Sequence, residues 1–574
     1  MTVSLAAQET SSSASSKSSE TAALQRGQQA LSRGDISSAR SEFEKAVRVA
    51  PNDVSAQTAL GWVLAQQGEQ AAAVTHLRAA LRLKPAAIEA RLTLASVLAQ
   101  QGKRAEAEQE GRTAIRMAPS NAEAHRTLAR ILSHDSPDEA LKEMRRAVEL
   151  APQRPDLRDE LGTLLAQRND FAESATEFEK AVELQPSLES AHFHLGVIRL
   201  QQQKLDDAAR ELEQAVKLAP QDVTAHYYLA KTYTAQAKNS EALDELKKSA
   251  ALKPDWYELQ TELGIASQRA GDIDAAIAAF NQAVKLRPDD ADAYNDLGLA
   301  MVQKGEADDA ISKFKAAAQL RPDDGTMRGN LAIAYLQLAN FDAAVTELEA
   351  ALKLAPDNAS LHYNLGLAYK LQDQLDKAVP EFETAIRLQP DLADAYYTLG
   401  ILYWQRGQFD KATEQLRGAL QAKPDYAEAH YTLGTIYKQQ RKLEQASAEL
   451  KEAIRLQPDF AGAHVTLAGV LRQLGDSPGA AAEAKEGARI AASVNNLQAA
   501  KVATNSGKRL LGAGDMEGAM SQFRSAIHSE PNYAAAHYEL GLALQQSGKK
   551  DEAKEEFQKA ASLDPHLTTP APSH

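Results

Sequence analysis

Seven histidines recur at one position of a 34-residue period, and imidazole is both a metal ligand and a proton carrier. They are His125, His192, His226, His362, His430, His464 and His537. A zinc site needs several ligand atoms at about 2 Å from one ion. Equivalent residues in neighbouring repeats of a helical array are separated by a helix pair, and packed helices lie about 8–10 Å apart. The spacing therefore indicates a repeated packing position, and we expect no metal site and no cofactor.

The spacing of Gly512, Gly514 and Gly518 partly matches that of the glycines in a phosphate-binding loop. Such a loop follows a β-strand, and no strand pattern precedes this one. Gly514 instead falls at the turn between two expected helices. The sequence contains no H-E-x-x-H motif, Walker loop or nucleophile elbow. We therefore expect a protein that is not an enzyme.

Composition excludes further classes of protein. The formal net charge of −14 argues against binding to a nucleic-acid backbone. The sequence has no cysteine, so it has neither a disulfide framework nor thiolate chemistry. No apolar run approaches the roughly 20 residues that a membrane span needs. These features leave a partner that is a protein or a peptide.

Prolines mark the period along almost the whole chain. Successive prolines of this series are 34 residues apart, with one step of 33 between Pro119 and Pro152 and a longer gap after Pro458. The series consists of Pro51, Pro85, Pro119, Pro152, Pro186, Pro220, Pro254, Pro288, Pro322, Pro356, Pro390, Pro424, Pro458, Pro531 and Pro565. Proline ends a helix because it lacks an N–H donor and clashes with the preceding turn. The period therefore predicts a series of short helices that end together.

The unit from Ala393 to Tyr426 shows how one period is built. Its first half carries Tyr396, Leu399, Gly400 and Tyr403 on one helical stripe, and its second half carries Ala412, Leu416 and Ala419 on another. Gly407 separates the two halves and Pro424 closes the second. This pattern resembles the tetratricopeptide repeat (TPR), W-x2-L-G-x2-Y followed by A-x3-F and P, with Tyr in place of Trp and Leu in place of Phe.

The resemblance implies an all-α, right-handed TPR superhelix, an α-solenoid of about sixteen helix-turn-helix repeats. We expect a disordered Ser-rich segment at 1–19, repeats 1–14 at 20–494, an irregular joint at 495–499, repeats 15–16 at 500–567 and a disordered tail at 568–574. The joint is expected because Ala484 replaces a bulky residue and no proline closes repeat 14. Residues 1–19 lack a signal-peptide pattern, which favours a cytoplasmic protein; export to the periplasm is the alternative if the true N-terminus lies upstream.

The candidate binding surface is the side of each first helix that faces away from the packing stripe. Counted from the start of that helix, positions 4, 7, 8 and 11 share the packing face, and positions 2, 6, 9 and 13 lie opposite, with 5 and 12 on the flanks. In the TPR family this opposite side lines a concave groove. The candidate groove residues are Trp62, Phe193, Tyr227, Lys231, Asn330, Tyr363, Asn364, Tyr397, Trp404, Tyr431 and Tyr538.

These candidates leave two interpretations open. Tyrosine and tryptophan combine apolar area with a hydrogen-bonding tip, as residues in protein interfaces do. The position-5 aromatic residues are equally suited to packing between repeats. Asn330 and Asn364 resemble two rungs of the asparagine ladder in O-GlcNAc transferase arrays, but the chain has no room for the transferase domain. No three consecutive repeats carry the Lys, Asn and Arg set with which some TPR domains bind a C-terminal carboxylate.

The sequence therefore favours a non-enzymatic scaffold that binds a protein or peptide segment in its concave groove. Two alternatives stay open: an accessory subunit for the assembly or secretion of a larger complex, and a regulatory subunit of a separately encoded enzyme. The sequence does not indicate an oligomeric state.

Overall fold

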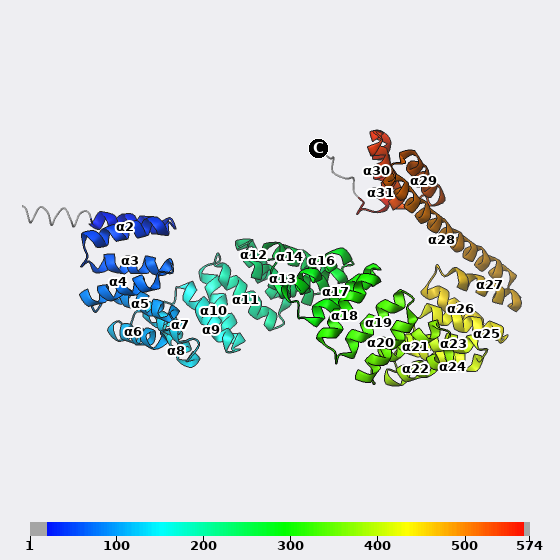
Figure 1. The fold of residues 1–574 in the computed structure, drawn as a ribbon, viewed down its shortest axis with the longest axis horizontal. Helices are drawn as coiled ribbons and strands as arrows, with labels where there is room; N and C mark the ends of the chain where they lie inside the picture. The colour runs from blue at the N-terminus through cyan, green and yellow to red at the C-terminus, as the bar shows by residue number, and fades with distance from the viewer. Residues whose placement is uncertain (1–19, 568–574) are drawn as a thin grey trace, which may run out of the picture. The chain divides into compact units, whose positions relative to one another are not determined.

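The computed structural model describes residues 20–567, and within that range helix is the only regular secondary structure (Figure 1). The all-α fold expected from the repeat is thus confirmed. The expectations for 1–19 and 568–574 lie outside the described residues. The helices form two compact units, which divide between Asp289 and Asp290.

The first unit begins with helical residues 20–32. Its further helices are α2 (Ile36–Val49), α3 (Val54–Gln66), α4 (Gln70–Leu83), α5 (Ile88–Gln100), α6 (Arg104–Met117), α7 (Ala122–Leu132), α8 (Pro137–Leu150), α9 (Pro155–Gln167), α10 (Phe171–Leu184), α11 (Glu189–Gln201), α12 (Leu205–Leu218), α13 (Val223–Ala235), α14 (Asn239–Leu252), α15 (Tyr257–Arg269) and α16 (Ile273–Leu286).

The second unit continues the alternation of first and second helices. It contains α17 (Ala291–Lys304), α18 (Ala307–Leu320), α19 (Gly325–Gln337), α20 (Phe341–Leu354), α21 (Ala359–Leu371), α22 (Leu375–Leu388), α23 (Ala393–Gln405), α24 (Phe409–Ala422), α25 (Ala427–Gln439), α26 (Leu443–Leu456), α27 (Ala461–Leu474), α28 (Ser477–Gly512), α29 (Met516–Ser529), α30 (Ala534–Gln546) and α31 (Lys550–Leu563).

Two kinds of residue set the ends of these helices. The second helices end two residues before a closing proline, as α12 does at Leu218 before Pro220. Within most repeats, the turn between the two helices contains one residue with a positive φ. That residue is glycine in nine turns, and in six turns it is a residue with a side chain, such as Ala237 or Ala339. The left-handed conformation reverses the chain so that the two helices lie antiparallel.

Close contact between the two helices of a repeat depends on a glycine in the first helix. A Cβ atom on Gly298 would lie 2.6 Å from the ring of Phe314, and one on Gly400 would lie 2.9 Å from Leu416. Separations under about 3 Å are not tolerated, so these glycines let a large side chain of the second helix reach the first.

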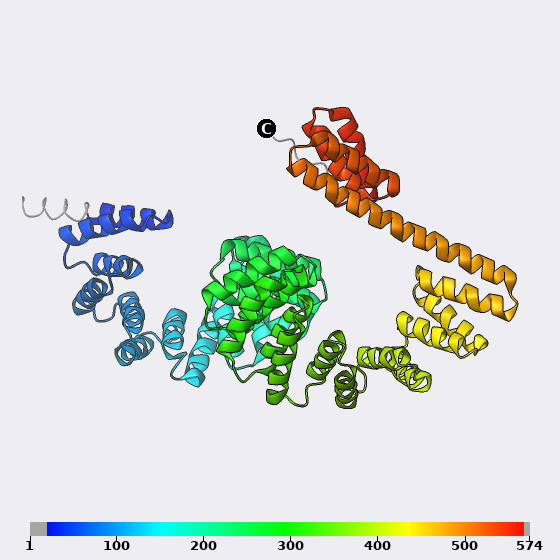
Figure 2. The same cartoon turned by 45° about the vertical axis from the view of Figure 1, so that its right-hand side comes forward.

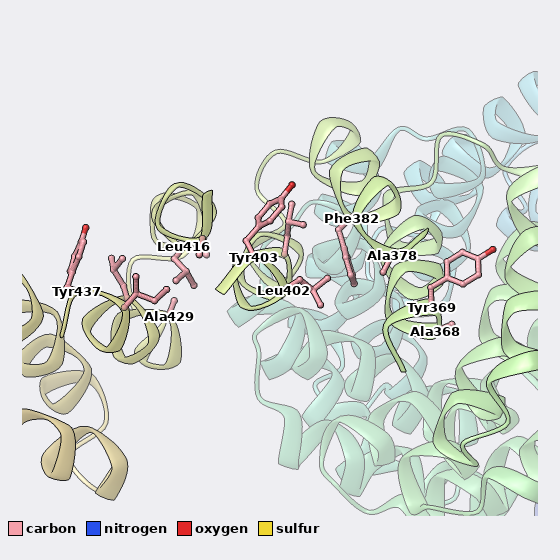
Figure 3. Close-up of a cluster of buried hydrophobic side chains, with 14 of the residues drawn as sticks. Ala368, Tyr369, Ala378, Phe382, Leu402, Tyr403, Leu416, Ala429 and Tyr437 are labelled. Carbon is pink, nitrogen blue, oxygen red and sulfur yellow. The ribbon is translucent and has the colours of Figure 1, made fainter. Parts of the chain in front are cut away.

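Neighbouring repeats are joined by a shared apolar core and by hydrogen bonds at its edge. In Figure 3, Tyr369, Tyr403 and Tyr437 stand at equivalent places along the core cluster of the second unit. The hydroxyl of Tyr369 donates to Glu349 at 2.8 Å, and that of Tyr403 donates to Glu383 at 3.0 Å. Each acceptor belongs to the second helix of the preceding repeat, so each bond crosses a repeat boundary.

The structure differs from the expectation of an irregular joint at 495–499. These residues lie inside α28, one helix of 36 residues that combines the second helix of repeat 14 with the first helix of repeat 15 (Figure 2). The physical reason is that no proline follows Pro478 until Pro531 and that the intervening sequence is rich in alanine, the strongest helix former. At 1.5 Å per residue the helix is about 54 Å long.

Within residues 20–567, no helix combines the length and the apolar character needed to cross a membrane.

Candidate protein-binding groove

A groove of about 1250 Å³ runs over the first helices of the four N-terminal repeats. Its lining comes from residues 20–32 and from α3, α5 and α7. In α3 and α5 most of the lining residues occupy positions 2, 5, 6, 9, 12 and 13 of the helix: Ser55, Thr58, Ala59, Trp62, Ala65 and Gln66, and Glu89, Leu92, Thr93, Ser96 and Gln100. Val54, Ile88, Ala90 and Val97 of the same helices also contribute. The structure therefore places the face opposite the packing stripe on a concave surface.

Trp62 is the largest apolar side chain presented to this groove, and 38% of its surface is exposed. The lining also contains four charged residues, Lys84, Glu89, Glu123 and Arg130, two of each sign. The wall around Trp62 is otherwise made of alanine, leucine, threonine, serine and glutamine side chains. An uncharged surface of this kind offers apolar contact area, chiefly from the indole of Trp62. Its hydroxyl and amide side chains can form hydrogen bonds with the backbone of a bound polypeptide.

A second, smaller cavity of about 140 Å³ lies further along the first unit. Its walls are Thr163 and Ala166 of α9, Phe178 of α10, Phe193, His194, Val197 and Ile198 of α11, and Tyr228 of α13. Phe193 was a sequence candidate, whereas His194 and Tyr228 were not. Both occupy position 6 of a first helix, so the periodicity that selected Asn330 and Asn364 also applies to them.

The position-5 aromatic residues contact rings of neighbouring helices. Ring centroids lie 4.6 Å apart for Tyr227 and Trp256, 5.0 Å for Tyr397 and Tyr426, 4.7 Å for Tyr431 and Phe460, 5.7 Å for Tyr363 and Phe382, and 5.6 Å for Tyr538 and Phe557. In the first three pairs the second ring precedes the first helix of the next repeat. These aromatic residues therefore contribute to packing between or within repeats, and their contact with a partner stays a prediction.

Burial of these rings differs along the chain. Tyr227 is 8% exposed, and burial together with Glu262 raises its pKa to about 12. Burial also raises the pKa of Tyr363. Lys231 lies over the ring of Tyr227, 5.5 Å from its centroid, in a cation–π contact. Tyr363, Tyr397, Tyr431 and Tyr538 are half-buried, so each keeps part of its ring accessible.

The remaining candidates form polar links between adjacent repeats. Asn330 donates from Nδ2 to Oδ1 of Asn295 at 2.7 Å, which adds a residue that sequence reasoning had not selected. Asn364 is half-buried on the equivalent turn of the next first helix. Trp404 donates from Nε1 to Oε1 of Gln439 at 2.9 Å. The candidate residues thus lie on successive first helices and not in one compact site.

Each recurring histidine bridges the second helix of its own repeat and the closing proline of the preceding repeat. In His430, Nδ1 lies 2.6 Å from the carboxylate of Glu449 and Nε2 lies 3.2 Å from the carbonyl oxygen of Pro424. The same two kinds of partner hold His125, His192, His226, His362, His464 and His537. In His430 both partners accept hydrogen bonds, and a ring that donates to both carries two protons.

Glutamine takes the place of histidine in two repeats. Gln57 donates to the carbonyl of Pro51 at 2.7 Å, and Gln260 donates to that of Pro254 at 3.1 Å. The position therefore links the end of one repeat to the start of the next, in agreement with its assignment as a packing position. Among residues 20–567, no group of three or more histidine and acidic side chains is arranged to hold a metal ion.

Family models identify the repeat over most of the chain. One tetratricopeptide repeat model matches residues 24–88, 92–155, 160–211, 195–255 and 261–325. Three further tetratricopeptide repeat models match 301–365 and 403–459, 357–425, and 534–567. No protein of curated function matches the chain.

Several solved structures are similar to this chain. The Cut9–Hcn1 structure of the APC/C is 14% identical and covers 79% of this chain and 96% of its own, with a TM-score of 0.36. Yeast Tom70 is 17% identical and covers 74% and 96%, with a TM-score of 0.33. YrrB, a TPR protein described as having an unusual peptide-binding site, is 25% identical and covers 32% and 95%, with a TM-score of 0.28.

The matched segments run almost without interruption from 24 to 459 and resume at 534–567. They agree with helix pairs, turn residues and closing prolines seen in the structure. Members of this family act in general as scaffolds for interactions with proteins or peptides and are typically not enzymes. The chain belongs to the tetratricopeptide repeat family.

Proposed function

We propose that this protein is a non-enzymatic scaffold that binds an extended protein segment along the concave face of its first helices. The observation that carries the proposal is the groove of about 1250 Å³ on the first helices of four consecutive repeats. Its extent over the first helices of four repeats and its mostly uncharged lining suit a polypeptide better than a small charged metabolite.

The proposal predicts that Trp62 contributes more to peptide binding than any other residue of the groove. A large aromatic side chain at the centre of an interface is the usual location of a binding hot spot, whose truncation costs about 2 kcal/mol or more. We expect Trp62→Ala to weaken binding of a groove-bound peptide at least tenfold. Because Trp62 is already exposed in the free protein, the substitution leaves the helix content unchanged.

The test uses the full-length protein and a displayed library of random twelve-residue peptides. Peptides selected on the wild type are assayed by fluorescence anisotropy against Trp62→Ala and against Leu83→Ala. Leu83 is a matched control because it is 42% exposed but lies at the end of a second helix, outside the groove lining. Equal binding to all three proteins, or selection of no peptide, contradicts the proposal.

A further inference from the structure

The cavity between α9, α11 and α13 has the size and lining of a receptor for one apolar side chain. Its volume of about 140 Å³ is close to that of engineered protein cavities of about 150 Å³ that bind benzene. Phe178 forms its floor and is 1% exposed. The walls come from groove positions of three successive first helices, so the cavity opens toward the groove.

Small side chains of α9 line one side of the cavity. Ala166 occupies position 12 of α9, and Thr163 occupies position 9 of the same helix. On the next helix, Phe193 packs edge-on against Tyr228, with centroids 5.7 Å apart. This contact holds the two rings as a wall and prevents either from filling the space beside Ala166. The cavity is therefore formed before any partner binds.

Carboxylate groups lie next to this cavity. Asp159 is 8% exposed, accepts a hydrogen bond from Ser190 at 3.0 Å and lies 2.8 Å from Nδ1 of His194, which lines the cavity. Glu189 lies four residues before Phe193, about one helical turn or about 6 Å along α11. Burial and the proximity of Asp222, with which Glu189 shares a side-chain hydrogen bond, raise the pKa of Glu189, and Asp159 adds to this effect while His194 opposes it.

Asp222 is already engaged with backbone groups. Its carboxylate caps α13 through the N–H groups of Thr224 at 2.8 Å and Ala225 at 3.3 Å. A cationic side chain brought to Glu189 and Asp222 would relieve the repulsion between the two carboxyl groups and keep both ionised. An ammonium or guanidinium group therefore complements this edge of the cavity, while a carboxylate is repelled.

We propose that this part of the groove binds a protein segment with one bulky apolar residue, phenylalanine or leucine, and a lysine or arginine no more than two residues away. The apolar side chain enters the cavity, and the basic side chain reaches Glu189 and Asp222. Successive residues of an extended chain advance about 3.3 Å, so two residues span the one helical turn that separates the two contacts. This inference rests on the proposed function, since it specifies the ligand of the same groove.

The first experiment fills the cavity. Peptides selected from the displayed library are sequenced and tested on full-length wild type, Ala166→Phe and Ala166→Leu, with Ala172→Phe as the matched control. Ala172 is an exposed residue near the start of the second helix α10, away from the face of the first helices, and does not line the cavity. We expect an enriched pair of apolar and basic residues, and an at least tenfold loss of affinity in the Ala166 variants only. Circular dichroism shows whether each variant folds. If Ala166→Phe does not fold, the peptide affinity of Ala166→Leu, which carries a smaller side chain, tests the prediction.

The second experiment removes the charges without changing the shapes. In Glu189→Gln with Asp222→Asn, asparagine retains the capping ability of Asp222. We expect this variant to bind the selected peptides several-fold more weakly than the wild type does. We also expect its affinity for them to stop depending on the salt concentration. A selected motif without a basic residue, or unchanged affinity in this variant, overturns the charge complementarity.

The outcomes separate this inference from the proposed function. If peptides bind in a manner that depends on Trp62 but not on Ala166, the groove binds segments and this cavity is not their receptor. If wild type self-associates in sedimentation experiments and Ala166→Phe abolishes that association, the occupant is a second copy and the proposal is overturned. If no peptide is selected at all, both proposals fail.

Discussion

The histidine bridge shows how one side chain can make a helical repeat sensitive to pH. His430 is placed between two acceptors, Glu449 and the carbonyl of Pro424, with Glu452 nearby. Burial acts to lower the pKa of His430, but the hydrogen bonds to Glu449 and Pro424 and the two carboxylates outweigh it, so the pKa is raised above 6.5. The doubly protonated ring is thus favoured by folding.

The raised pKa has a definite sign for stability. The contribution of His430 is fully present below pH 6.5, the pKa of the unfolded chain, and is lost as the pH rises through the folded-state pKa. We expect His430→Gln to lower stability at pH 6 by about 1.5 kcal/mol, the lower end for a hydrogen bond to a charged group. The deficit should shrink toward pH 9, because glutamine still donates to the Pro424 carbonyl, as Gln57 and Gln260 do at their prolines.

Thermal unfolding of wild type and His430→Gln, measured side by side from pH 6 to pH 9, checks this prediction. A constant difference between the two proteins would show that the bridge acts by shape alone.

Turn residues with a positive φ supply a second residue-scale prediction. Ala339 has φ 54°, a conformation that costs a residue with a side chain about 1–2 kcal/mol. We expect Ala339→Gly to stabilise the protein by about 0.5 kcal/mol or more, after allowance for the greater freedom of glycine in the unfolded chain. Ala488→Gly in the exposed middle of α28 is the control and should destabilise by about 1 kcal/mol. Urea unfolding distinguishes the two signs.

At the scale of elements, α28 is the exception to the alternation of short helices. Its first part packs on α27 and its last part on α29, but between them residues 492–496 are all exposed. Val494 and Val502 are 60% and 59% exposed, and Val465 of α27 is 57% exposed, because no neighbouring first helix covers them. The middle of α28 is therefore stabilised by its own backbone hydrogen bonds alone.

We expect the region from α28 onward to open at a lower free energy than the regular repeats before it. A repeat is stabilised mainly by its neighbours, and α28 packs both on α27 and on α29 and α30, which carry the C-terminal core around Phe523. Hydrogen exchange should release amides of residues 492–496 first, then those of α29 to α31, and those of α23 to α26 last. Uniform protection across α28 would refute this order.

Much of the element structure was predictable from the sequence because its signals are local. A closing proline ends a helix, and a glycine opposite a phenylalanine, as in Gly298 and Phe314, sets the distance between two helices. The continuous helix at 495–499 was not predicted in this way, because the missing proline was interpreted as a break in the repeat, although a segment without proline can continue as one helix. The Trp62 groove followed from helical periodicity, whereas the cavity at Ala166 depends on side chains of four helices and cannot be read from one repeat.

For the whole molecule, the repeat explains how a chain of 574 residues folds without one large core. Each helix pair buries its apolar face against the next pair, and stability is close to a sum of neighbouring contacts. The first helices are left with a free face, which differs in chemistry from repeat to repeat: neutral around Trp62, apolar and acidic around Ala166, and aromatic around Tyr397. Such variation on a constant framework suits the recognition of different parts of an extended partner.

The net charge of −14 adds a second property of the whole molecule. A negative surface attracts basic segments over distances of about 8–10 Å at moderate ionic strength and repels acidic ones. This agrees with the basic residue expected in the ligand of the Ala166 cavity.

The central claim is that the concave face of the first helices binds a protein segment, and site-specific photo-crosslinking tests it most directly. A photoreactive phenylalanine analogue replaces Trp62 in one full-length protein and Leu83 in another, and each is irradiated with the same library-selected peptides. Mass spectrometry then maps the cross-linked residues. The groove account predicts cross-links from position 62 and none above background from position 83. Cross-links from position 83 alone, or equally from both positions, would contradict it.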